Sequence, residues 1–177
     1  MITNIQLTTK EKYLLEDAKT HEEECILKYD NYAKLASCDQ LKSVFRSNGQ
    51  KEREHLQSIN ELLSGKVPSM SGGQSGGQSG SQSGSQNQSS GQQSSSASQQ
   101  SSGSQSNNSS SFQASDKDMC IDMLNTEKYV SGAYNTAIFE FKDASVRDVL
   151  NHIQTEEQKH GEAIFAYMQS KGMYQPK

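Results

Sequence analysis

The chain has 177 residues, of which 31% are hydrophobic and none is Trp, and its 17 basic and 21 acidic residues give a net charge of −4. An acidic balance without a cluster of Lys or Arg excludes a nucleic-acid-binding surface, and the lack of any run of about 18 apolar residues excludes a membrane-spanning helix. Because residues 1–6 lack the basic start and apolar core of a secretory signal, we expect synthesis in a cytoplasm.

Helical patterns cover four stretches of the chain, namely residues 8–36, 38–64, 115–141 and 143–171. The residues suited to cap the four helix starts are Thr8, Ser37, Ser115 and Asp143. Gly65 is expected to end the second helix, and Gly172 the last. We therefore predict a first helical hairpin in residues 1–66 and a second in residues 115–177.

Residues 67–114 separate the two hairpins and contain no charged residue. Positions 71–111 consist of 19 Ser, 10 Gln, 8 Gly, 3 Asn and 1 Ala, which cannot bury enough apolar surface to offset the entropy of ordering. A flexible linker is therefore predicted. Its reach of about 35–40 Å matches the length of a helix of about 27 residues and lets the third helix lie parallel to the second. The excess length also permits exchange of hairpins between chains, or a role as an assembly tract.

Apolar residues recur at steps of three and four along each helix, and each stripe has acidic or histidine residues at its middle. In the first helix the stripe consists of Leu15, Ala18, Glu22, Cys25, Tyr29, Tyr32 and Ala36. The stripes of the other helices contain Glu52 and His55, then Glu127, then Glu157 and His160. Charged residues in a stripe that faces the core indicate a buried polar site.

The two halves are related by an internal repeat with an offset of 105 residues and no gap. This offset aligns the first three of these residues, Glu22, Glu52 and His55, with the second three. Only seven of the 45 positions over residues 22–66 are identical, but three of the seven are these charged residues. We therefore expect an all-α fold, a four-helix bundle made of two similar hairpins.

In each hairpin the two Glu lie about 21 Å from the turn, at one level, and the i, i+3 spacing places Glu and His on one face of the helix. Two hairpins packed face to face then bring four carboxylates and two imidazoles together. Burial alone would raise the pKa of these carboxylates until several bound protons, whereas two divalent cations balance their charge. The six predicted ligands are Glu22, Glu52, His55, Glu127, Glu157 and His160. Oxygen-rich ligation with one nitrogen per metal favours two iron or two manganese ions over a thiolate zinc site.

The alternative is a bundle in which the same residues hold no metal, because a single Glu-x-x-His match more often lies on a solvated face. Two such matches, each preceded at 30 residues by a Glu at the centre of a stripe, favour the metal site. His21 and His152 lie off the stripes and are expected at the surface. Core packing is the expected role of Tyr29 and Tyr134, with contact to a ligand as the less common one.

Three cysteines, Cys25, Cys38 and Cys120, form no Cys-x-x-Cys pair and are odd in number. This pattern argues against a disulfide scaffold or a thiolate zinc site. We expect reduced thiols, with Cys25 and Cys120 buried as small hydrophobic side chains and Cys38 in a turn.

The order Glu, Glu-x-x-His, Glu, Glu-x-x-His resembles that of ferritin-like proteins, which include bacterioferritins, manganese catalases and rubrerythrins. The resemblance covers both hairpins and not the linker, and it implies a ferritin-like bundle with a dimetal site. Rubrerythrins carry a further Glu where this sequence has Val130, and they add a rubredoxin module with four Cys that is absent here.

The C-terminal part resembles the Coat F family of spore coat proteins more closely. The resemblance rests on EEQKHGEAIFAYM at 156–168 and KGMYQP at 171–176, together with LLED at 14–17. It implies a structural or assembly role in the endospore coat, synthesis in the mother-cell cytoplasm, deposition on the spore and other coat proteins as partners. The competing hypothesis is a dimetal oxidoreductase that handles peroxide or O₂. The two functions are compatible, and self-association through exchanged hairpins is open in both.

Overall fold

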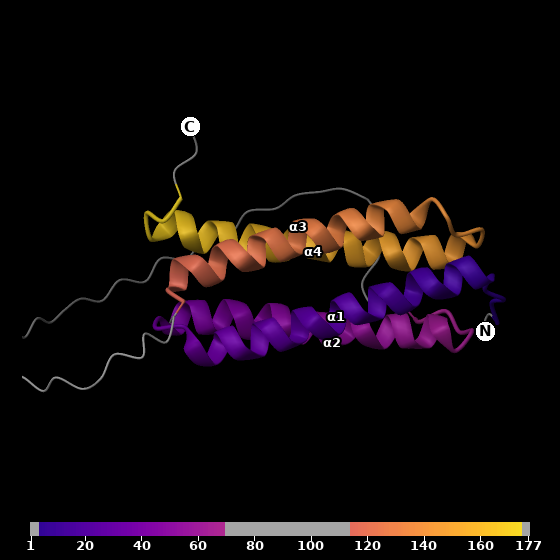
Figure 1. The fold of residues 1–177 in the computed structure, drawn as a ribbon, viewed down its shortest axis with the longest axis horizontal. Helices are drawn as coiled ribbons and strands as arrows, with labels where there is room; N and C mark the ends of the chain where they lie inside the picture. The colour runs from indigo at the N-terminus through magenta and orange to yellow at the C-terminus, as the bar shows by residue number, and fades with distance from the viewer. Residues whose placement is uncertain (1–3, 70–113, 175–177) are drawn as a thin grey trace, which may run out of the picture. The chain divides into compact units, whose positions relative to one another are not determined.

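The computed structural model describes residues 4–69 and 114–174, and in these it is all-α, as predicted. The four helices are α1 (Thr9–Leu35), α2 (Asp39–Leu63), α3 (Asp116–Ile138) and α4 (Ala144–Ser170) (Figure 1). None of these helices is long and apolar enough to cross a bilayer. The predicted flexible linker lies, over residues 70–113, outside the described part of the chain.

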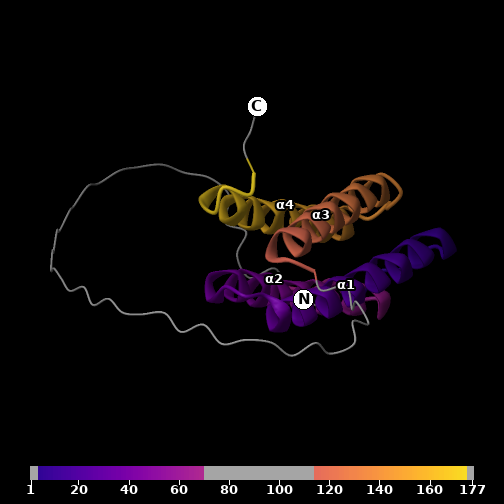
Figure 2. The same cartoon turned by 60° about the vertical axis from the view of Figure 1, so that its left-hand side comes forward.

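The helices form two antiparallel hairpins, α1 with α2 and α3 with α4, which pack against each other through α1 on α3 and α2 on α4 (Figures 1 and 2). At one end Ser37 donates from its N–H and its hydroxyl to the Asp116 carboxylate, at 2.8 and 2.7 Å. At the other end the backbone N–H of Lys142 donates to Glu11 at 2.9 Å. These contacts make α1 antiparallel to α3, so α3 runs parallel to α2, as the crossover predicts.

Three of the four predicted helix starts are capped by the expected side chains. Thr8 and Glu11 form a complete capping box at α1, and Ser115 and Asp118 form one at α3. The Asp143 carboxylate accepts from the backbone N–H of the second residue of α4 at 2.9 Å. At the other ends, Gly65 follows α2 with a φ of 82° and Gly172 follows α4 with a φ of 67°, as predicted.

The predicted cap at Ser37 is wrong. The residue before α2 is Cys38, and it makes no side-chain hydrogen bond to the first turn. The Ser37 hydroxyl instead donates to Asp116, 79 residues away in the chain. A residue with the spacing of a helix cap therefore joins the two hairpins instead.

The apolar core consists of two clusters, one toward each end of the bundle. The first includes Leu15, Ile59, Val130 and Ile153, and the second includes Leu41, Phe45, Met123 and Ile164. On α2, α3 and α4 the predicted polar residues fall between these clusters. The predicted stripe of α1 is buried throughout except at Tyr32, which is half-buried while its neighbour Ala33 is buried instead.

Gly49 allows α2 to approach α1 closely beside the polar layer. A Cβ at this position would lie 2.9 Å from the Cβ of Tyr29, closer than two such atoms pack. Because Cβ atoms are fixed to the backbone, a larger residue would push the two helices apart. The glycine therefore sets the separation of α1 and α2 at the level of Tyr29.

We predict that Gly49→Ala lowers the free energy of unfolding by about 1–2 kcal/mol, because overpacking costs about 1–3 kcal/mol and exceeds the gain of about 1 kcal/mol in helix propensity. The matched control is Gly132→Ala in α3, where an added Cβ meets no atom within 4 Å. This control should stabilise the protein by about 0.5–1 kcal/mol. Urea unfolding of both variants measures the difference, and changes of the same sign would contradict the steric explanation.

Candidate metal centre

The structure brings all six predicted side chains together between the two apolar clusters. Each helix contributes from the middle of its buried stripe, so the side chains point into the bundle and not into water. None is more than 4% exposed. The contributing residues are Glu22 from α1, Glu52 and His55 from α2, Glu127 from α3, and Glu157 and His160 from α4.

The six side chains form two overlapping groups of four. One group contains Glu22, Glu52, His55 and Glu157, and the other contains Glu52, Glu127, Glu157 and His160. In each group one ligand atom from every member lies within 4.8 Å of all the others. Each group therefore has its own histidine and one carboxylate of its own, and both share the same two carboxylates.

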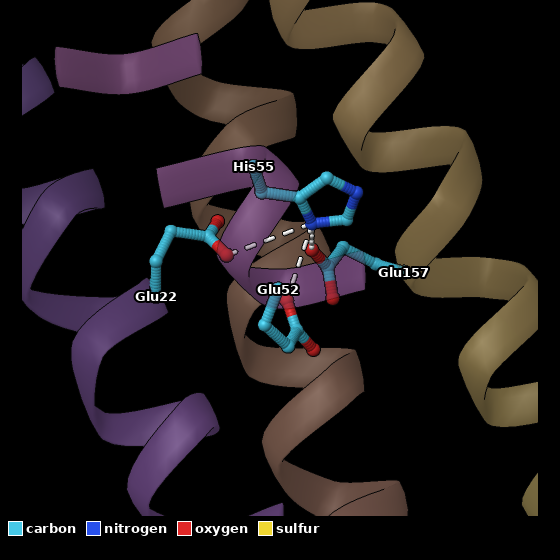
Figure 3. A group of neighbouring side chains, drawn as sticks. All are labelled: Glu22, Glu52, His55 and Glu157. Atoms are coloured by element: carbon cyan, nitrogen blue, oxygen red, sulfur yellow. Dashed lines mark hydrogen bonds and ion pairs between the residues drawn. The ribbon is translucent and has the colours of Figure 1, made fainter. Parts of the chain in front are cut away.

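The two oxygens of each shared carboxylate face different histidines. The Nδ1 atom of His55 lies 3.2 Å from Glu52 Oε2 and 3.1 Å from Glu157 Oε1 (Figure 3). The Nδ1 atom of His160 lies 3.1 Å from Glu52 Oε1 and 3.6 Å from Glu157 Oε2. Glu22 completes the first group at 3.6 Å from His55, and Glu127 the second at 3.6 Å from His160. A carboxylate with one oxygen toward each of two centres has the arrangement of a bridging ligand.

Burial changes the pKa of several groups in the cluster. It raises the pKa of Glu22 to about 8, although the nearby imidazole of His55 acts in the opposite sense, and it raises the pKa of Glu127 well above the ordinary value. Burial disfavours the charged form of His160, but the carboxylates around it raise its pKa to about 11. In the absence of cations the cluster therefore balances its negative charge with protons on the imidazoles and on some of the carboxylates.

Several polar atoms of the cluster have no hydrogen-bond partner among the described residues. They include Oε2 of Glu22, Oε1 of Glu52, Oε2 of Glu127 and both oxygens of Glu157. Buried carboxylate oxygens without partners are costly, and native proteins satisfy nearly all such groups. An oxygen-rich set of unpartnered donors with two imidazoles fits divalent cations well.

Two tyrosines orient the carboxylates that are not shared. The hydroxyl of Tyr29 donates to Glu127, and the hydroxyl of Tyr134 donates to Glu22, so each bond joins one hairpin to the other. Asn48 donates in turn to the Tyr29 oxygen at 3.1 Å. The sequence pattern favoured core packing for both tyrosines. They are buried in the core, and they also hold the carboxylates of the cluster.

Glu156 is a contact of the cluster that the helical pattern did not predict. Its carboxylate lies 2.9 Å from Nε2 of His55, and this hydrogen bond holds the pKa of Glu156 down, at about 2. Nε2 of His160 has no such partner in the described parts of the chain, and the repeat places Lys51 where a second Glu156 would stand. The two groups therefore contain the same kinds of residue, but only the histidine of the first group, His55, has a carboxylate partner on its Nε2 atom.

The remaining candidates lie outside the cluster. The ring of His21 packs edge-on against Tyr129 with 5.3 Å between ring centroids, and His152 lies 3.6 Å from Glu156. Both are half-buried. Cys25 and Cys120 are buried free thiols, as predicted.

We predict that Tyr29→Phe and Tyr134→Phe each lower the free energy of unfolding of the metal-free protein by about 1–3 kcal/mol, because each leaves a buried carboxylate without its donor. Tyr129→Phe is the control, since this side chain is 66% exposed and makes no hydrogen bond to a carboxylate within residues 4–69 and 114–174. It should change stability by less than about 0.5 kcal/mol. Denaturant unfolding followed by circular dichroism gives the comparison. Equal effects at all three positions would show that the hydroxyls do not support the carboxylates.

Comparison with known proteins identifies the second hairpin. Residues 115–177 match the family model of the Coat F domain. No curated protein and no solved structure matches the chain. The match begins at the N-cap of α3, contains both α3 and α4, and includes Glu127, Glu157 and His160 of the cluster. The second hairpin, residues 115–177, is therefore a match to the Coat F family.

Proposed function

We propose that the chain is a spore coat protein whose helical bundle holds two iron or two manganese ions. The observation that carries the metal centre is the pair of overlapping groups, in which Glu52 and Glu157 each direct one oxygen to either histidine. Glu22 and Glu127 would each bind one ion, and the shared carboxylates would bridge both. His55 and His160 would bind through Nδ1.

Charge balance supports two ions in place of one. Four carboxylates match the charge of two divalent cations, so full occupancy would leave the interior close to neutral without added protons. The ligand set of four Glu and two Glu-x-x-His histidines is that of dimetal carboxylate bundles. Because ferritin-like proteins have the same order of Glu and Glu-x-x-His residues, the proposal also places this bundle among the ferritin-like proteins.

A pair of bound iron or manganese ions supplies redox chemistry with peroxide or O₂. The chain contributes positioning and exclusion of water around it. Tyr29 and Tyr134 hold the unshared carboxylates in place, and an apolar cluster lies on either side of the centre. In this proposal the coat protein also disposes of oxidants at the spore surface.

A structural role in the coat is the second candidate function, and the Coat F match favours it. In this role the protein is made in the mother-cell cytoplasm and deposited on the spore, where other coat proteins are its partners. The uncharged Ser, Gln and Gly tract between the hairpins supplies hydrogen-bonding groups suited to a packed layer, and hairpin exchange would link neighbouring chains. Fractionation of purified spores tests this role, because the protein should be recovered with the coat and not with the cytosol of vegetative cells.

We predict about two metal ions per chain after expression with iron or manganese, measured by elemental analysis of the purified protein. The double substitution Glu52→Gln with Glu157→Gln should lose both ions, because each neutral amide replaces a shared ligand. Glu16→Gln with Glu54→Gln changes exposed glutamates outside the cluster and should leave the metal content unchanged. A folded wild-type sample with less than about 0.3 metal per chain would remove the metal centre from the proposal.

Glu156→Gln should lower the affinity for one of the two ions by about 10–100-fold and leave the affinity for the other unchanged. The reason is that a carboxylate hydrogen-bonded to a metal-binding imidazole raises the basicity of the ring and fixes its orientation. Calorimetric titration of the chelator-treated protein with Mn²⁺ separates the two steps. Glu54→Gln, an exposed neighbour of His55 in α2, is the control. Equal weakening of both steps would contradict the unequal support of His55 and His160.

A further inference from the structure

A groove of about 690 Å³ runs along the second hairpin between α3 and α4, and the candidate metal centre contributes to its lining through Glu127 and Glu157. A second groove, of about 550 Å³, lies between α1 and α3 and contains none of the six residues of the centre. The α3/α4 groove is therefore the larger of the two and the one that meets the centre.

The groove occupies space that side chains leave free at two glycines in the middle of helices. A Cβ added at Gly132 would meet no atom within 4 Å, and one added at Gly161 would meet only Leu124, at 3.9 Å. The internal repeat places Leu27 and Leu56 at the equivalent positions of the first hairpin. Because glycine within a helix costs about 0.5–1 kcal/mol relative to alanine, two glycines in the hairpin that carries the groove are a stability cost that packing does not explain.

The walls change in character along the groove. At one end Leu124, Phe165 and Tyr174 form an apolar wall, in which the last two rings meet edge to face with 5.1 Å between centroids. At the other end the groove is lined by uncharged hydrogen-bonding side chains, including Asn135 and Gln154. From Gln154 to Phe165 along α4 the distance is about 16 Å.

The electrostatic balance of the walls favours an uncharged occupant. Lys128 and Glu162 have opposite charges and both line the groove, so they offset each other. Glu127 and Glu157 present carboxylate oxygens that have no hydrogen-bond partner among the described residues and can accept from a hydroxyl group. The volume is that of a site for a small organic molecule, for which pockets of about 300–1,000 Å³ are usual, and it greatly exceeds the needs of peroxide or O₂.

We propose that this groove is a binding site for an uncharged aromatic molecule of the phenol class. The ring packs against Leu124 and Phe165, and the hydroxyl group is directed toward Glu127 and Glu157. The position of this molecule next to a metal pair rests on the proposed function, whereas the binding site itself does not. The two hairpins thus differ at these positions, since the second has glycines that line a groove where the first has leucines.

The test uses the full chain, p-cresol as the probe and calorimetric titration to measure its affinity. Gly161→Leu fills the groove at its middle and should weaken p-cresol binding by about tenfold or more, the scale of such changes in apolar pockets. Gly161→Ala leaves most of the space free and is the matched control. Ala166→Leu places the same side chain on the exposed side of α4, outside the groove. Both controls should bind p-cresol within about twofold of the wild type.

Circular dichroism establishes that each variant keeps its helices, and a Leu at position 161 has better helix propensity than Gly. Failure of the wild type to bind p-cresol would overturn the proposal. Undiminished binding by a folded Gly161→Leu variant, or equal weakening by Ala166→Leu, would overturn it as well.

Repeating the titration with Mn²⁺ separates this proposal from that of the metal centre. If both are right, bound Mn²⁺ accelerates the proton relaxation of p-cresol in the wild type. Binding of p-cresol by a protein that takes up no Mn²⁺ would support the groove and remove the metal centre. Uptake of two Mn²⁺ ions without binding of p-cresol would support the metal centre and remove the proposed binding site in the groove.

Discussion

The burial of four carboxylates at one level of the bundle is the constraint on which the rest of the structure depends. Carboxylates removed from water must bind protons, cations or hydrogen-bond donors, and this bundle has groups arranged for that purpose. Two histidines lie among the carboxylates, and two tyrosines donate to the pair that is not shared. The polar layer divides the apolar core into two clusters, so the centre is also the place where the helices have least apolar packing.

Most of this arrangement follows from helical periodicity. Steps of three and four placed the acidic and histidine residues within otherwise apolar stripes, and the offset of the repeat placed both sets at the same level. In α1, Ala33 is buried in place of the predicted Tyr32. Alternating steps of three and four average about 3.5 residues per turn, whereas an α-helix has about 3.6, so the predicted stripe drifts from the buried face toward the end of a long helix.

Other features depend on contacts between distant parts of the chain and were not predictable from local pattern. Ser37 has the spacing of a cap, but its hydroxyl bonds to Asp116 in the other hairpin. Glu156 lies one residue off the stripe of α4 and reaches His55 only because α2 packs beside it. The groove arises from the absence of side chains at Gly132 and Gly161, and a helical pattern carries no signal for the space between two helices.

The two hairpins contribute equal halves of the cluster, and neither half contains a complete group of four. Each group takes at least one carboxylate from the opposite hairpin, and each tyrosine bond crosses between hairpins. The contacts are therefore the same whether the complementary half comes from the same chain or from a neighbour. Two chains that exchanged hairpins would rebuild two whole clusters from the same six side chains, so the number of clusters per chain would be conserved while the chains become physically interlinked.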